Sequence, residues 1–347
     1  MCSVVTVLLI LLSFFSEASS QWVKISSKAF PVIGSSGGML HFKNGVLWGG
    51  YRSLRVSLDT GKTWVTKINS FPNINDFLMN IDFVDAQIGL VRTAGNNSAG
   101  NIFYTNDQGA NWIAQTPPGL SGSRYTINAG PGIVISCARD GIYSSFNGGN
   151  SFIRTYSGAT PNILTSRGNG VIAAFEAARV VVSTDFGQSW TVKPFDQTLQ
   201  DSYSMEFDYC DTNRLYLANE DFFVKHNNVS EVIVSADRGG NWVSKNQQSL
   251  GVFSGAMAVT QNAAYFQTIS SGLYRTTDGG NNWTNIPAPT SYPDSRMLVA
   301  LTDNILVCVD QNGDVWRTDN SGGFPVSPQA IPLLTDPRAL TIKSCSS

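Results

Sequence analysis

The 347-residue sequence predicts an all-β fold: a single β-propeller with seven blades of four antiparallel strands, closed by the N- and C-terminal strands. Three observations predict it. An eight-residue pattern ending in an aromatic residue recurs along the chain, short apolar runs separate its copies, and no long stretch has helical periodicity. The composition agrees, because 32 glycines and only 14% charged residues suit short strands joined by tight turns.

The first 20 residues are interpreted as a cleaved secretory signal peptide, and residues 21–347 as the propeller. Val4 to Phe15 is an uncharged, largely apolar run that is too short for a comfortable membrane span. Ala18-Ser19-Ser20 offers small residues for cleavage after Ser20. No Lys or Arg precedes the run, and an uncleaved N-terminal anchor is the alternative. The expected localisation is therefore secreted, or extracellular.

Charge excludes two classes of partner. Cleavage removes Glu17 and no basic residue, which leaves 23 basic and 24 acidic side chains and a net charge of −1. Because there is no basic excess to neutralise phosphates, we expect no nucleic-acid partner. No basic cluster is suited to an anionic membrane, and we expect no membrane insertion after signal cleavage.

The repeat has the form Ser/Thr-X-Asp-X-Gly-X-(Thr/Ser/Asn)-Trp. Its aromatic residue recurs at intervals of 38 to 52 residues, which is the spacing of a four-stranded blade. The third copy has Asn147 and Phe152 at the Asp and Trp positions, and a shortened seventh copy starts at Thr318. The six full copies occupy residues 57–64, 105–112, 145–152, 183–190, 235–242 and 276–283. In the second unit we expect strands at residues 80–84, 88–92, 101–105 and 111–115.

The chemistry of this pattern is local. An Asp in a tight turn accepts hydrogen bonds from backbone N–H groups two or three residues further on, and the Ser or Thr hydroxyl can bond the same loop. The Gly can adopt a positive φ, and the Trp packs its indole against the hairpin at the start of the next strand. Residues 21–25 resemble a strand of this kind without a preceding turn. We therefore expect them to pair with C-terminal strands and close the ring, although six or eight blades remain open alternatives.

Four cysteines follow the signal segment, and they allow three disulfide connectivities. Cys137 and Cys308 lie in apolar runs and are expected to be buried thiols, whereas a Cys210–Cys345 bridge is an open alternative. With only His41 and His226 and no paired cysteines at ligand spacing, we expect no metal site and no cofactor.

The repeated turns resemble the Asp-box, or BNR, repeats of sialidases, sortilin-type receptors, xyloglucan-active glycosidases and photosystem II assembly-factor-type propellers. The resemblance covers essentially the whole chain after the signal segment and concerns the scaffold. Residues 81–89 with their following turn are most similar to the assembly-factor type, whereas the secretory signal fits a photosynthetic role poorly. In these families the boxes lie on the face away from the ligand. The resemblance therefore implies structural roles for Asp59, Asp107, Asn147, Asp185, Asp237 and Asp278.

The catalytic signatures of those families are absent. Sialidases carry a Phe/Tyr-Arg-Ile-Pro motif, and the nearest string here, Phe152-Ile-Arg154, lacks the Pro and follows a turn. Sortilin-type receptors have more blades and a cysteine-rich module, and the xyloglucan enzymes use a cleft between two propellers. None of these patterns is met by this sequence.

Propeller ligands usually bind the face that carries the inter-blade loops and the loops between each second and third strand. On that face the candidate binding residues are Arg52, Arg124, Arg139, Phe222 and Arg296, where arginines could grip a carboxylate and an aromatic ring could stack. The alternatives to ligand binding are that the arginines are solvated or donate hydrogen bonds to loop carbonyls, and that the Phe packs beneath its loop. Glu176 and Glu220 are weak candidates for a catalytic carboxylate pair in glycoside hydrolysis. The alternative is that both are ordinary exposed acidic side chains without a catalytic role.

We therefore interpret the chain as a secreted, non-enzymatic recognition protein that binds a protein or glycan ligand through this face. One alternative is a glycoside hydrolase or lyase of sialidase-like scaffold with a non-standard site. A second is an assembly or scaffolding factor. Asn96, Asn228 and Asn282 begin Asn-X-Ser/Thr sequons and are candidate glycosylation sites.

Overall fold

A computed structural model describes much of the chain as short antiparallel strands. The described residues are 22–31, 38–71, 77–94, 101–115, 125–138, 140–158, 163–166, 170–176, 179–194, 205–209, 215–219, 232–246, 253–260, 262–268, 272–286, 288–289 and 297–320. For part of these strands only the backbone is described. Within these ranges the strands form seven four-stranded sheets and there is no α-helix. Accordingly, none of the described residues forms a helix that is long and apolar enough to cross a membrane.

Six of the sheets are built from four consecutive strands each. Their strands are β2 (Met39–Lys43), β3 (Val46–Gly50), β4 (Leu54–Ser57) and β5 (Val65–Ile68); β6 (Phe77–Phe83), β7 (Gly89–Ala94), β8 (Ile102–Thr105) and β9 (Ile113–Gln115); β10 (Tyr125–Gly130), β11 (Ile133–Ala138), β12 (Gly141–Ser145) and β13 (Ile153–Ser157); β14 (Ile163–Ser166), β15 (Ile172–Glu176), β16 (Arg179–Ser183) and β17 (Thr191–Pro194); β18 (Met205–Tyr209), β19 (Leu215–Asn219), β20 (Val232–Ser235) and β21 (Val243–Asn246); and β22 (Phe253–Ala258), β23 (Ala264–Thr268), β24 (Gly272–Thr276) and β25 (Thr284–Ile286).

The remaining sheet joins the two ends of the described chain. It has the order β1-β28-β27-β26, formed by β1 (Val23–Ser26), β26 (Leu298–Ala300), β27 (Leu306–Val309) and β28 (Val315–Thr318). Val23 pairs with Arg317 and Lys24 with Trp316. The N-terminal strand therefore pairs with a C-terminal one, as the repeat-like sequence of residues 21–25 suggests.

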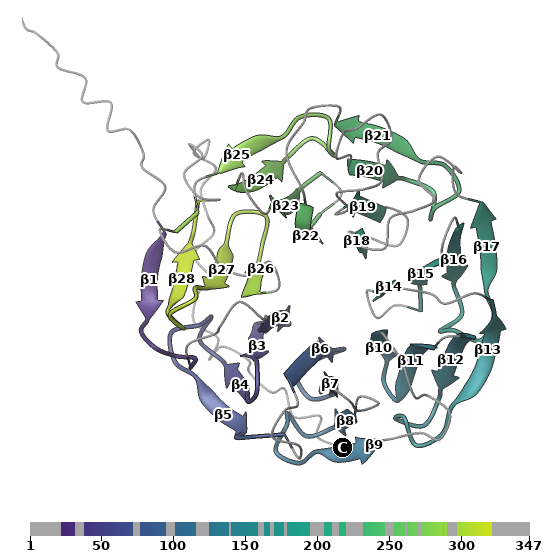
Figure 1. Cartoon of the computed structure of the whole chain (residues 1–347), viewed down its shortest axis with the longest axis horizontal. Helices are drawn as coiled ribbons and strands as arrows, with labels where there is room; N and C mark the ends of the chain where they lie inside the picture. The colour runs from purple at the N-terminus through teal and green to yellow at the C-terminus, as the bar shows by residue number, and fades with distance from the viewer. Residues whose placement is uncertain are drawn as a thin grey trace, which may run out of the picture.

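Figure 1 shows the sheets arranged around a common centre. In the six sheets of consecutive strands the first strand is innermost and the last outermost, whereas in the remaining sheet β26 is innermost and β1 outermost. The buried apolar side chains lie between neighbouring sheets. The Trp48 ring on β3 stacks on the Phe83 ring of β6 at a centroid distance of 4.0 Å, and Trp112 meets both rings edge-on. Sheet-to-sheet packing of this kind makes each sheet depend on its neighbour for burial.

The repeated turn joins the third and fourth strands of a sheet through a fixed set of hydrogen bonds. In the first copy, the backbone N–H and the hydroxyl of Thr63 donate to the Asp59 carboxylate at 2.9 and 2.6 Å. The Ser57 hydroxyl donates to Asp59 and accepts the Gly61 N–H. The carboxylate thus reaches four residues along the chain, further than the two or three residues expected from the sequence.

The same pattern recurs in the other full copies. The central side chain accepts the backbone N–H four residues on, and the first residue's hydroxyl accepts the Gly N–H, at Asp107, Asn147, Asp185, Asp237 and Asp278. These hydrogen bonds hold the backbone of each turn in one conformation and thereby fix how the third and fourth strands are paired.

Two successive residues in each turn have a positive φ. The glycine is one of them, for example Gly109 at +70°, and the residue before it is the other, with Gln108 at +60° and Phe186 at +61°. The space at Gly109 also favours glycine, because a Cβ there would lie 3.0 Å from the Trp112 ring and 3.1 Å from the Trp48 ring of the neighbouring sheet. The glycine therefore serves both the turn and the contact between sheets.

Cys137 on β11 and Cys308 on β27 are buried and are not joined to another cysteine by a disulfide bond. Burial, together with nearby Asp310, raises the pKa of Cys308 well above its usual value, so this thiol stays protonated and unreactive. Cys210 and Cys345 lie outside the described residues.

Candidate functional site

The strand order places two kinds of loop at opposite ends of the sheets. In a four-stranded antiparallel sheet, the connection between the second and third strands lies at the same end as the connection to the next sheet. The repeated turns, between the third and fourth strands, lie at the other end. We call the first end the loop face and the second end the turn face.

Three side chains form a cluster on the loop face between the first two of these sheets. Tyr51 and Arg52 follow β3, and Phe77 begins β6. The Arg52 guanidinium lies 5.6 Å from the centre of the Tyr51 ring, and the Tyr51 and Phe77 rings are 6.0 Å apart. Arg52 is exposed, while both rings are partly buried. We call Tyr51, Arg52 and Phe77 the Tyr51 cluster.

Backbone contacts fix the position of this cluster. The Leu78 N–H donates to the Tyr51 carbonyl at 2.7 Å, which ties the β3–β4 loop to the next sheet. Gly50 allows the chain to turn tightly, since a Cβ there would lie 1.8 Å from the Ser53 carbonyl oxygen. Arg52 therefore projects from a loop that is anchored at its base, which lowers the entropy lost when a ligand binds.

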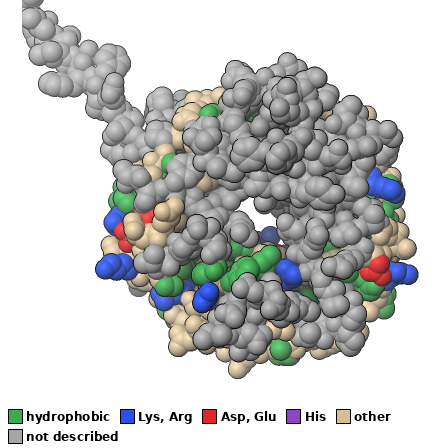
Figure 2. All heavy atoms as spheres, in the orientation of Figure 1, with side chains coloured by type: hydrophobic (Ala, Val, Ile, Leu, Met, Phe, Trp, Pro, Cys, Tyr) green, Lys and Arg blue, Asp and Glu red, His purple; other side chains and the backbone are tan. Residues whose placement is uncertain are grey.

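The surface next to the central opening carries apolar and cationic side chains. Figure 2 shows hydrophobic side chains gathered in the region of β3 and β6 beside the opening, with Lys and Arg side chains close to them. A cation over an aromatic ring is stabilised by the ring quadrupole by about 0.5–1 kcal/mol at an exposed site. Such a surface can accept an anionic group next to an apolar one.

Asp310 and Asp314 organise a second loop on this face, between β27 and β28. Asp310 is buried and accepts the backbone N–H groups of Asn312 and Asp314 and the indole N–H of Trp316. Asp314 accepts the Lys24 ammonium at 2.5 Å and the Lys28 N–H at 2.8 Å. Hydrogen bonding to Lys24 and Lys28 lowers the pKa of Asp314. Asp310 therefore organises the loop itself, and Asp314 holds the N-terminal segment against it.

The other predicted site residues are not brought into this cluster by any described contact. Glu176 ends β15, where its backbone pairs with Arg179, and its side chain is not described. The remaining ones lie outside the described residues: Arg124, Arg139, Glu220, Phe222, Arg296, Asn96 and Asn228. The sequence did not predict that Phe77 belongs to the candidate site. The one feature that could have indicated it is an aromatic residue at the first position of an inner strand, directly after a loop.

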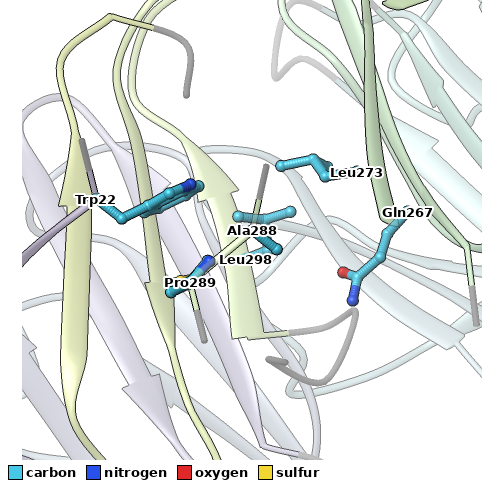
Figure 3. Close-up of a pocket in the computed structure, with 7 residues that line it drawn as sticks. Trp22, Gln267, Leu273, Ala288, Pro289 and Leu298 are labelled. Carbon is cyan, nitrogen blue, oxygen red and sulfur yellow. The ribbon is translucent and has the colours of Figure 1, made fainter. Parts of the chain in front are cut away.

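A small gap lies between the β22–β25 sheet and the sheet that contains β1. Figure 3 shows Trp22, Leu273 and Leu298 around it, with Gln267 at one side. Its lining is mostly apolar and completed by Ala288, Pro289 and Cys308, and its size is of the order of one water molecule. It is therefore a packing defect between sheets and too small for a sugar or peptide side chain.

Among the residues that the structure describes, no group of three or more His, Cys, Asp or Glu side chains is placed to hold a metal ion. The Asp carboxylates of the repeated turns are engaged by their own turns, as the bonds to Asp59 and Asp107 show.

The four-stranded sheets around a common centre define the class: the chain is a β-propeller. No family model matches the sequence, and no curated protein matches it. The fold therefore has to be placed by structural similarity.

Several solved propellers superpose on most of the chain. "YCF48 bound to D1 peptide" is 15% identical with a TM-score of 0.61, covering 86% of this chain and 99% of the other. Streptogramin B lyase is 10% identical with a TM-score of 0.62, covering 86% and 96%. A GH74 xyloglucanase from Xanthomonas campestris is 14% identical with a TM-score of 0.61, covering 88% of this chain and 54% of the other. Identities this low show the fold alone.

Proposed function

We propose that this chain is a secreted, non-enzymatic recognition propeller that binds a protein ligand through its loop face. We further propose that it is an Asp-box propeller of seven blades, closed by the pairing of β1 with β28. The Tyr51 cluster is the observation that carries the functional proposal.

Arg52 has the features of an anchor for a ligand. It is exposed, it lies over the Tyr51 ring, and no described carboxylate pairs with it. A guanidinium can bind a carboxylate through two parallel hydrogen bonds. The neighbouring Tyr51 and Phe77 rings offer apolar surface at small entropic cost, and Tyr and Arg are enriched among the residues that dominate binding energy in protein interfaces.

The structural neighbours support a peptide ligand only by analogy. One of them was solved with a bound peptide, on a propeller with nearly the same extent. The neighbours also include enzymes, but nothing among the described side chains favours hydrolysis here. The test below therefore distinguishes peptide binding from three alternatives. These are glycan binding, glycoside cleavage by Glu176 and Glu220, and a scaffolding role.

The test exposes the purified chain to a peptide array and to a glycan array, reading both retained protein and altered ligand. We expect retention on peptides that carry a carboxylate beside an apolar residue. The dissociation constant of the best peptide should rise at least about tenfold in Arg52→Ala, which corresponds to about 1.4 kcal/mol. Lys62→Ala is the control, because it removes one positive charge from an exposed position on the turn face.

Two results would contradict this proposal. Equal affinities of the Arg52→Ala variant and the unsubstituted protein for that peptide would remove the Tyr51 cluster from the binding site. Loss of a terminal sugar on the glycan array would make the chain an enzyme, and the Glu176→Gln and Glu220→Gln variants would then locate its acids.

A further inference from the structure

The sixth repeated turn contains a sequon that the proposed function does not use. Asn282, Trp283 and Thr284 form Asn-X-Thr at the end of the turn, and both Asn282 and Thr284 are exposed. The Asn282 backbone and side-chain amides donate to the Asp278 carboxylate at 2.9 and 2.7 Å. The acceptor asparagine is thus held at the surface in one conformation.

Two other turns place an asparagine at the same position. Asn111 and Asn241 make the same pair of hydrogen bonds, to Asp107 and Asp237. Two residues further on, however, these turns carry Ile113 and Val243, each 55% exposed. Among the described turns, the sixth alone combines the asparagine with a hydroxyl at this position. The fourth turn has Thr191 there but a serine in place of the asparagine, and the other four turns carry Val or Ile.

We propose that Asn282 carries an N-linked glycan. A side-chain amide has two N–H groups, so one can remain on Asp278 while the sugar replaces the other. In the transfer, the Asn282 Nδ2 forms a bond to C1 of the sugar and loses a proton. The bond between C1 and the phosphate of a lipid-diphosphate-linked oligosaccharide donor breaks at the same time.

The position of Asn282 gives the glycan a defined place on the molecule. It lies on the turn face, at the start of the outermost strand β25, and therefore away from the Tyr51 cluster. A glycan there leaves the loop face open to a ligand. It also covers the outer edge of a sheet, where unpaired backbone groups invite pairing with another chain.

The experiment uses the full chain secreted from cultured eukaryotic cells. Enzymatic removal of N-glycans in heavy-oxygen water converts each glycosylated Asn into a labelled Asp, which peptide mass spectrometry locates. We expect the label at Asn282 and none at Asn111 or Asn241. Asn282→Thr should abolish it and leave the thermal midpoint unchanged, because Thr63 makes the equivalent bonds in the first turn.

Two further variants test the sequon at this position of the turn while leaving the asparagine and its hydrogen bonds in place. Thr284→Val, which copies Val65 and Val243, should remove the label while Asn282 remains. Ile113→Thr creates the same sequon at Asn111 and should gain a label there. An unlabelled Asn282 in the secreted protein overturns the proposal, and so does a label that survives Thr284→Val.

Discussion

In the turn of residues 105–112, the Asp107 carboxylate accepts hydrogen bonds from the backbone N–H and side-chain amide of Asn111 and from the Thr105 hydroxyl. The backbone bond from Asn111 is the largest cause that lowers the pKa of Asp107 to about 2, from a usual 3.8. Because the folded pKa is the lower one, ionised Asp107 stabilises the fold above the unfolded pKa. This stabilisation is lost as the pH falls from about 4 towards about 2.

The substitution Asp107→Asn tests this pH dependence with a side chain that the third turn already carries as Asn147. We expect the variant to be less stable than the unsubstituted protein near neutral pH. The difference should shrink as the pH falls through the window between the two pKa values. Urea unfolding midpoints of both proteins, between about pH 7 and pH 2.5, measure it. A difference that stays constant across this range would contradict the assignment.

Residue types in the turn predict one part of its geometry and miss another. The glycine signals its own positive φ, because other residues resist it. The preceding position has a positive φ as well. It is a glycine in the third and sixth turns, but the other four turns place Thr60, Gln108, Phe186 and Arg238 there, which share no left-handed preference. A left-handed conformation costs a non-glycine residue roughly 1–2 kcal/mol, and the hydrogen bonds of the turn offset it. In those four turns the conformation is set by the turn as a whole, and the residue type carries no signal of it.

Among the elements, the loop between β27 and β28 carries a testable contact with the N-terminal segment. Asp314→Ala removes the partner of the Lys24 ammonium and of the Lys28 N–H. We expect a loss of about 1–3 kcal/mol in the free energy of unfolding, because Asp314 is largely buried and its hydrogen bonds involve charge. Chemical denaturation measures it.

Asp319→Ala is the matched control for this loss. Asp319 pairs with Arg317 on the same sheet, but its side chain is 67% exposed. Exposed ion pairs typically contribute between 0 and about 1 kcal/mol, so the control should lose little. Equal losses in the two variants would show that Asp314 does not hold the N-terminal segment.

Strand positions follow from the sequence to within a few residues, and loop contacts do not. The strands expected at residues 80–84, 88–92 and 101–105 correspond to β6, β7 and β8, although β6 starts three residues earlier. The strand expected from residue 111 begins at Ile113, because Asn111 and Trp112 still belong to the turn. Alternation of apolar and polar residues indicates a strand in the sequence. The contact between Tyr51 and Phe77, in contrast, depends on how two sheets pack together.

For the whole molecule, β1 is expected to protect the outer edge of the last sheet. Deleting residues 22–26 leaves β28 without its outer neighbour and exposes its backbone groups to other chains. We expect a lower thermal midpoint and concentration-dependent association, measured by calorimetry and light scattering. A chain that starts at Gln21 is the control. If the deletion variant stays monomeric and equally stable, β1 has no part in closing the propeller.

The pairing of β1 with β28 also has a consequence for biosynthesis. Val23 is made early, but its partner Arg317 emerges from the ribosome 294 residues later. At about 5–20 residues per second, the delay is roughly 15–60 s. During that time the first strand has no partner, while the intervening sheets can already form from consecutive strands. The first strand to be synthesised is therefore among the last to pair, and a chaperone that binds unpaired strands would act on this strand for longest.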